Sequence, residues 1–134
     1  MIFLGILEHP DSKSNDKAGG AQAYSEVIWA IGPDYFEQHK EYIMQCTVDP
    51  NIYMRESYIG LFVYLPGIMD EAFEKYLSSI LDNLVESLAD ENESIRSLTL
   101  RVLRIFIEKY GHKKTHLLLI PINEGLFRYE SSFK

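Results

Sequence analysis

One spacing recurs three times in this sequence and restricts the folds it can adopt. An acidic residue is followed six positions later by a basic one at Asp11 to Lys17, at Asp49 to Arg55 and at Asp90 to Arg96. The acids of successive copies therefore stand about 40 residues apart, and so do the bases. A period of this size, with helical patterning between the copies, is typical of stacked pairs of α-helices.

Apolar residues keep the same register after each basic residue. Steps of three and four place side chains on one side of an α-helix. Counting four, seven and ten positions on gives Ala21, Tyr24 and Val27, then Ile59, Phe62 and Leu65, then Leu100, Leu103 and Phe106. The sequence therefore predicts an all-α chain, a HEAT-repeat solenoid of stacked antiparallel helix pairs with about three repeats and truncated ends. Residues 1–134 are expected to form a single segment of a longer solenoid, with repeat turns near 11–17, 49–55 and 90–96.

Helix boundaries follow from apolar periodicity and from glycine and proline. Gly32-Pro33 and Pro66-Gly67 are expected to end helices, and Gly111 is expected to cap another. Trp29 and Tyr24 are expected to pack in the core or between repeats. The predicted helices span residues 17–31, 33–46, 54–65, 71–88, 95–110 and 113–124, after the last turns of a helix at 2–7.

Composition narrows the class of protein. The 134 residues are 46% apolar, which is enough for one continuous core, and the net charge of −7 disfavours a general nucleic-acid binder. The single cysteine, Cys46, is expected in the core of a protein from a reducing compartment. The apolar start at residues 1–7 is too short for a membrane span and lacks a basic leader, so we expect a cytoplasmic protein with no membrane partner.

Catalytic and cofactor motifs are not recognisable. The sequence has no glycine-rich phosphate loop and no nucleophile elbow, so we expect neither an enzyme nor a cofactor. His112 and His116 have a spacing that could bind zinc on a helix, but no third ligand is near and Lys113 and Lys114 would repel a cation. We therefore predict no metal site.

The repeated charged residues allow two interpretations. Regularly spaced charges could clamp a ligand. Alternatively, the acid of one turn can meet the base of the same or the next turn, since partly buried arginine pairs with carboxylates bidentately. We favour this second interpretation, a structural ladder that fixes how the repeats stack. The ladder residues are Asp11, Lys17, Asp49, Arg55, Asp90 and Arg96.

A basic cluster stands out in an otherwise acidic chain. It could contact nucleic-acid phosphate or an acidic partner. The alternative, which we favour, is a solvated turn without a partner. The cluster consists of Arg101, Arg104, Lys109, His112, Lys113 and Lys114.

A resemblance to a known family rests on residues spread through most of the chain, from about Asp16 to Phe127. They keep their order and a nearly constant spacing, which is more specific than the HEAT pattern alone. They are Gly19, Ala21-Gln22, Glu26-Val27, Gly32, Met54-Arg55-Glu56-Ser57-Tyr58, Tyr64-Leu65-Pro66, Leu88-Ala89-Asp90-Glu91-Asn92-Glu93, Arg96, Leu100-Arg101, Leu117-Leu118-Leu119 and Gly125-Leu126-Phe127. In these residues the chain resembles the general-control translational activator family (Gcn-one).

The resemblance implies a function without catalysis. The Gcn-one proteins are very large, ribosome-associated HEAT-repeat proteins that help to activate the kinase of the initiation factor two alpha subunit in amino-acid starvation. This stretch is similar to their elongation-factor-three-like middle segment, which implies the ribosome and an ABC-type translation factor as partners, with the kinase bound through other segments. Arg128-Tyr129-Glu130 departs from the family by replacing an acidic pair.

Two other classes of protein remain open. A HEAT-type nuclear-transport receptor, or another protein-binding scaffold, would bind apolar peptides between its helices, and the acidic balance suits it. A HEAT-like DNA glycosylase would need a basic concave face with a catalytic aspartate, which the net charge disfavours.

Overall fold

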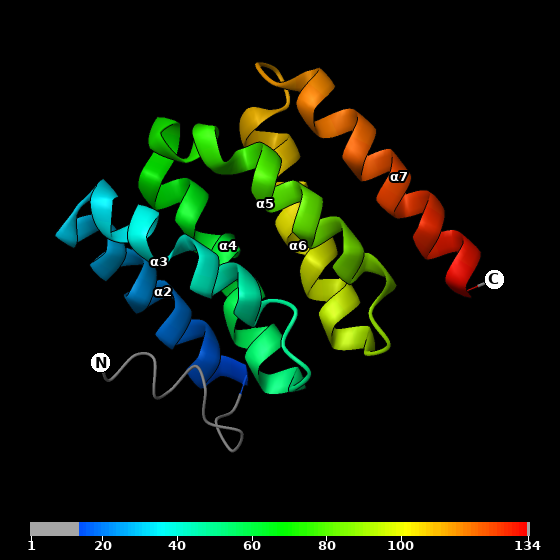
Figure 1. Cartoon of the computed structure of the whole chain (residues 1–134), viewed down its shortest axis with the longest axis horizontal. Helices are drawn as coiled ribbons and strands as arrows, with labels where there is room; N and C mark the ends of the chain where they lie inside the picture. The colour runs from blue at the N-terminus through cyan, green and yellow to red at the C-terminus, as the bar shows by residue number, and fades with distance from the viewer. Residues whose placement is uncertain (1–13, 134) are drawn as a thin grey trace.

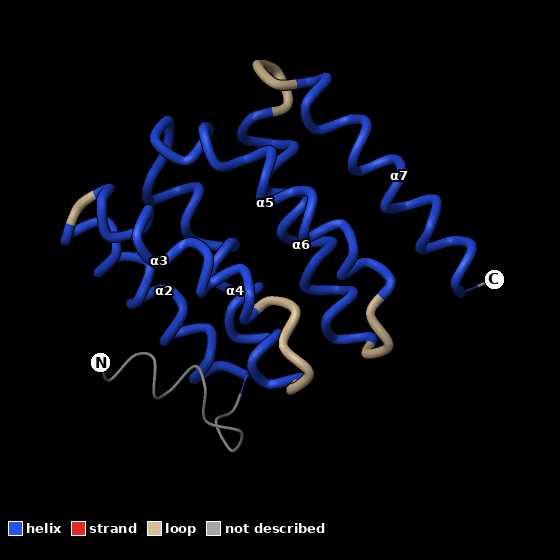
Figure 2. The backbone as a smooth tube through the Cα atoms, in the orientation of Figure 1, coloured by secondary structure: helices blue, strands red, loops and turns tan. Residues whose placement is uncertain are grey.

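The computed structural model describes residues 14–133, with side chains described at 20–32, 34–116 and 118–127. Helices account for most of this part of the chain, and it contains no strand (Figure 2). The helices, with η marking 3₁₀ segments, are α2 (Ser14–Ile31), α3 (Pro33–Cys46), α4 (Ile52–Met69), η1 (Asp70–Tyr76), α5 (Leu77–Leu84), η2 (Val85–Ala89), α6 (Glu93–Tyr110) and α7 (Thr115–Phe133).

The helices form two layers, and successive repeats stack side by side along one direction (Figure 1). In one layer α4 packs between α2 and α6, and in the other α7 packs on α5 and η2. With η1, α5 and η2 taken as one continuous arm, successive helices alternate between the layers, so each consecutive pair forms an antiparallel hairpin (Figure 1). The predicted all-α HEAT-repeat solenoid is therefore confirmed.

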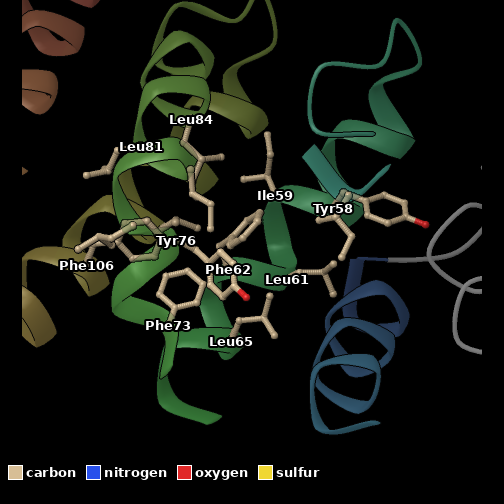
Figure 3. Packing of buried hydrophobic residues seen from close by; sticks show 14 of the residues in the cluster. Tyr58, Ile59, Leu61, Phe62, Leu65, Phe73, Tyr76, Leu81, Leu84 and Phe106 are labelled. Atoms are coloured by element: carbon tan, nitrogen blue, oxygen red, sulfur yellow. The ribbon is translucent and has the colours of Figure 1, made fainter. Parts of the chain in front are cut away.

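An aromatic cluster centred on Phe73 joins four elements of the core. Between ring centroids, Phe73 of η1 lies 6.5 Å from Phe36 of α3 and 6.3 Å from Phe62 of α4. It also lies 5.5 Å from Phe106 and 6.1 Å from Tyr110, both of α6. Figure 3 shows Phe62 and Phe73 within the buried apolar cluster. Since rings at these separations attract one another beyond simple area burial, the cluster ties two repeats together.

The helix predicted to end at Leu65 continues past Pro66 to Met69. A proline inside a helix removes one hydrogen bond and clashes with the preceding turn, at a cost of about 3 kcal/mol. Here Leu65, Pro66 and Met69 are all buried, and their packing outweighs that cost. The helix ends instead at Met69, and the next residue, Asp70, has a φ of 54°, in the region that non-glycine residues seldom adopt.

The single helix predicted for residues 71–88 is divided into η1, α5 and η2. Its apolar residues recur three apart at each end, as Phe73 and Tyr76 and again as Val85 and Leu88, all of them buried. In a 3₁₀-helix, residues three apart are aligned, so this tighter geometry directs both members of each pair into the core. Its predicted apolar face was nevertheless correct, since Phe73, Leu77, Ile80, Leu81, Leu84, Val85 and Leu88 are all buried.

The last observed helix, α7, differs at both ends from the helix predicted for residues 113–124. Gly111 caps α6 as predicted, with its N–H donating to the carbonyl of Ile107, and a turn then delays α7 until Thr115. The helix continues to Phe133 instead of ending near residue 124. Gly125 lies against η2, where an added Cβ would stand 2.9 Å from the Cβ of Val85, so α7 approaches too closely there for any larger residue. The predicted helix at 2–7 lies outside the described residues.

Two predicted core residues are on the surface. Trp29 of α2 is 41% exposed, and Leu100, a member of the repeated apolar stripe, is 38% exposed. Leu100 lies on α6, the last second helix of a repeat among the described residues. By contrast, Cys46 is buried in the core, as predicted.

Candidate functional site

The turns between the helices of a repeat are built by an aspartate and an asparagine. Oδ1 of Asp49 accepts a hydrogen bond of 2.8 Å from the backbone N–H of Asn51, and Oδ1 of Asn51 accepts one of 2.8 Å from Tyr53. The second bond caps the N-terminus of α4. The same arrangement recurs one repeat later, where Asp90 and Asn92 cap α6. The Asp-x-Asn sequence thus sets where α4 and α6 begin.

Arg55 bridges its own turn and the next one. Its Nη1 donates hydrogen bonds of 3.0 Å to the carbonyls of both Asp49 and Pro50. Its Nη2 donates to Oδ1 of Asp90 at 3.3 Å, and its Nε lies 2.9 Å from Oδ2, an ion pair outside hydrogen-bond geometry. Both side chains are only 11% exposed. Since water is largely excluded, this pair is screened much less than a surface pair.

Arg96 repeats the local half of this arrangement. Its Nη1 donates to the carbonyl of Asp90 at 2.7 Å, as Arg55 does to Asp49. Of the six residues in the predicted ladder, the structure therefore joins Arg55 with Asp90 across repeats and Arg96 with Asp90 within a repeat. The carboxylate of Asp49 holds its own turn. Asp11 and the side chain of Lys17 lie outside the described residues.

The predicted basic cluster is partly neutralised by the acidic residues of η1. Nζ of Lys109 lies 2.7 Å from a carboxylate oxygen of Asp70, and this hydrogen bond and charge lower the pKa of Asp70. Nζ of Lys113 lies 3.9 Å from carboxylate oxygens of both Glu71 and Glu74. These acids were missed in the sequence, although Asp70 and Lys109 stand about one repeat period apart, and that spacing was the available signal.

The other four members of the cluster are exposed. Arg101 and Arg104 lie one turn apart on α6, while His112 and Lys114 are in the turn before α7. All six members of the predicted cluster are therefore exposed, and two of them, Lys109 and Lys113, also lie near acids of η1. Because α6 ends before His112 and α7 begins at Thr115, His112 and His116 do not lie on one helix. No cluster of three or more metal-binding side chains occurs within the described residues.

A second contact between repeats joins α3 and η1. The hydroxyl of Tyr76 donates a short hydrogen bond to the carboxylate of Glu37, and the ammonium groups of Lys40 and Lys75 lie 5.2 and 5.0 Å from the Tyr76 ring centre. Burial and the hydrogen bond raise the pKa of Tyr76 to about 12. The same hydrogen bond is the main cause of the lowered pKa of Glu37. The arrangement holds two repeats together.

Comparison with known proteins agrees with this helical-repeat architecture. Residues 35–119 match a protein family described as "IPO5-like, TPR repeats", which is more than half of the chain. The chain belongs to this family. Its period of about 40 residues is closer to that of HEAT repeats than to the period of roughly 34 residues in a typical TPR repeat. No solved structure matches the chain.

Three curated relatives are similar over most of the chain. They are the eIF-2-alpha kinase activator GCN1 of Saccharomyces cerevisiae (31% identical, 87% of the chain), Protein ILITYHIA of Arabidopsis thaliana (35%, 75% of the chain) and the Stalled ribosome sensor GCN1 of Homo sapiens (33%, 87% of the chain). The chain spans about 4% of the length of each. The resemblance to the Gcn-one family is therefore confirmed. In the described part, no helix is long and apolar enough to cross a membrane.

Proposed function

We propose that this chain is a non-catalytic scaffold segment of a ribosome-bound translational activator, which promotes activation of the kinase of the initiation factor two alpha subunit in amino-acid starvation. The observation that carries the proposal is similarity over 87% of the chain to a protein named as an activator of that kinase and to another named as a stalled-ribosome sensor. The segment acts in the cytoplasm as one part of a longer solenoid. An ABC-type translation factor is a further partner, and the kinase contacts other segments of the full protein.

The contacts between repeats suit a scaffold. Arg55 and Asp90 join the second and third repeat turns through a largely buried ion pair, and Tyr76 joins α3 to the following repeat through Glu37. Charge pairs with little access to water hold a defined geometry, since separating them leaves a buried charge without its partner. In our proposal these contacts keep the repeats at a constant angle, so that surfaces on different repeats reach a large partner together.

The exposed basic residues of α6 and the following turn are the proposed ribosome contact. Arg101, Arg104 and Lys114 are exposed, and their charges remain available to the phosphates of ribosomal RNA. Lys109 contributes less to such a contact because Asp70 already pairs with it. Glu71 and Glu74 lie 3.9 Å from the ammonium group of Lys113 and weaken its attraction for phosphate. A contact of this kind depends strongly on salt, since each neutralised phosphate releases counterions.

Co-sedimentation with ribosomes across a salt series tests the contact. The test variant carries Arg101→Gln, Arg104→Gln and Lys114→Gln, which removes three positive charges. The matched control places three negative charges at exposed glutamines elsewhere, so that both variants have the same net charge. The control substitutions are Gln22→Glu, Gln38→Glu and Gln45→Glu.

We expect the unmodified chain and the control to pellet with ribosomes at low salt and the test variant to pellet weakly. The slope of log affinity against log salt should fall by about one for each phosphate contact that is lost. Equal pelleting of test variant and control would show that these residues are not the contact. If even the unmodified chain stays in the supernatant at low salt, the proposed ribosome binding by this segment is wrong.

A further inference from the structure

A polar cleft of about 400 Å³ lies between the turn before α4 and the turn before α6. Both turns lie along the same edge of the molecule (Figure 2). Residues 47–50 form one wall of the cleft, and residues 86, 87, 90 and 91 form the other. Arg55 and Asp90, whose ion pair joins the two turns, both line it. The cleft therefore belongs to two neighbouring repeats, and its volume lies within the range of ligand sites.

Negative charge exceeds positive charge in this cleft. Among the described residues, the carboxylates of Asp49, Glu86, Asp90 and Glu91 line it, against the guanidinium of Arg55. Arg55 pairs with Asp90. Within the described part of the chain, no ion pair joins Glu86 or Glu91 to a base. Walls that carry one sign of charge concentrate the electric field inside a cleft, so this one attracts a cation.

The hydroxyl of Ser87 is a second and independent indication of a ligand. Ser87 lines the cleft from η2 and is only 6% exposed, yet its hydroxyl has no hydrogen-bond partner among the described residues. The similarly buried Ser25 and Thr99 donate to the carbonyls of Ala21 and Ile95 in their own helices. Buried polar groups in proteins nearly always have a partner, because leaving one without costs about 1–3 kcal/mol. Ser87 therefore offers an oxygen to a donor that enters the cleft.

The arrangement of the acceptors indicates which kind of cation fits. No three metal-binding side chains converge within the described residues, so the acceptors are spread around the cleft and do not surround one point. A guanidinium suits such an arrangement, since its five N–H donors point in several directions within one plane. Val48 and Pro50 are exposed and line the same cleft, where they can cover the aliphatic stem of a long basic side chain.

We propose that this cleft binds an arginine side chain of a partner protein. The guanidinium donates to the carboxylates of Glu86 and Glu91 and to the hydroxyl of Ser87, while its stem packs on Val48. Asp90 stays paired with Arg55, so the ligand enters without breaking the contact between repeats. The repeated charged turns then both brace the repeats and form part of a binding site. The proposal does not rest on ribosome binding, which involves α6 and the turn that follows it.

The test titrates the full chain, labelled with nitrogen-15, with a capped peptide that has one arginine between glycines. The control peptide carries citrulline, which keeps the shape of arginine but lacks its charge. We expect saturable shifts of the backbone amide signals of Val48, Ser87 and Glu91 with the arginine peptide, and binding weaker by about tenfold or more with citrulline. Free arginine should also bind more weakly than the peptide, because the carboxylates of the cleft repel its own carboxylate.

Variants of the cleft locate the contact. Glu86→Gln combined with Glu91→Gln should weaken binding of the arginine peptide by about tenfold or more, and Ser87→Ala should weaken it by roughly tenfold through the loss of one hydrogen bond to a charged group. The matched control combines Glu26→Gln with Glu108→Gln, which removes the same charge from exposed positions on α2 and α6 and should leave binding within about twofold. Both pairs are surface substitutions, so their urea midpoints should stay close to that of the unmodified chain.

Three results would overturn the proposal. The first is equal affinity for the arginine and citrulline peptides, and the second is equal binding by the Glu86 and Glu91 variant and its matched control. The third is free arginine binding as tightly as the peptide, which would make the amino acid and not a partner protein the ligand. Saturable shifts of the same amides with calcium chloride, and none with the arginine peptide, would likewise refute it by identifying a metal site.

Discussion

Replacing Arg55 by methionine should destabilise the chain far more than any surface substitution. Methionine keeps most of the apolar stem but removes the ion pair with Asp90 and the hydrogen bonds to the carbonyls of Asp49 and Pro50. Breaking a fully buried ion pair costs about 3–5 kcal/mol, because the remaining charge is buried without its partner. Both side chains are 11% exposed, so we expect the lower end, about 3 kcal/mol. For a chain of this length that loss lowers the Tm by about 10 °C.

The assay is urea unfolding of a double-mutant cycle. The cycle contains Arg55→Met, Asp90→Asn and the double variant. Asparagine at position 90 keeps an oxygen that can still accept the turn hydrogen bond from Asn92, so the change removes mainly the charge. We expect the double variant to be more stable than the sum of the single losses predicts, by about 2 kcal/mol. Arg101→Met serves as the control, because Arg101 is exposed and its loss should stay within about 0.5 kcal/mol.

Additive losses in the cycle would refute the reasoning. They would show that Arg55 stabilises its own turn through Asp49 and Pro50 and that its contact with Asp90 contributes nothing between repeats. A loss for Arg55→Met no larger than that for Arg101→Met would be a stronger refutation. It would mean that the buried charge of Asp90 is satisfied without the arginine.

Two further predictions concern packing and pH. Gly125→Ala should lower the free energy of unfolding by about 1–3 kcal/mol, because the added Cβ would stand 2.9 Å from the Cβ of Val85. Gly60→Ala should raise it by up to about 1 kcal/mol, because nothing lies within 4 Å of its added Cβ. Urea unfolding measures both effects, and equal effects would contradict this reasoning. Tyr76→Phe should raise the lowered pKa of Glu37 in a carbon-13 NMR titration. Because that pKa is lower in the folded state, the stabilisation is present above the unfolded pKa and is lost as pH falls through the folded one. Tyr76→Phe should reduce this acid-side loss, and an unchanged Glu37 titration would disprove the link.

Helix positions and the core were largely predictable because their causes are local. The helix over Pro33–Cys46 was predicted with the observed boundaries, since proline starts a helix well and Gly32, with a φ of 125°, separates it from α2. The turns before α4 and α6 were predicted from an aspartate followed six residues later by a basic residue, at Asp49 to Arg55 and at Asp90 to Arg96. Helix periodicity also identified the apolar residues between 71 and 88 although the backbone there is not one continuous α-helix.

The candidate site was only partly predictable. The ladder residues were chosen from spacing, and the structure pairs Arg55 with Asp90; whether this pair sets the stacking of repeats stays a prediction for the double-mutant cycle. The basic cluster looked continuous in the sequence, yet Lys109 turns toward Asp70, one repeat earlier. A lysine side chain can pair with any nearby acid, so the spacing of about one repeat period between Asp70 and Lys109 points to this partner without fixing it.

The sequence by itself determined a stack of helix pairs, its period, its turns and most of its buried residues. These features depend on hydrogen bonds and side-chain directions within a few residues, which each segment carries with it. The tertiary structure alone decided that α4 runs through Pro66 and that Leu100 remains exposed although Ile59, its equivalent, is buried. Both outcomes depend on packing against a neighbouring element, because a buried contact can outweigh an unfavourable local preference and an apolar residue stays exposed where no helix covers it.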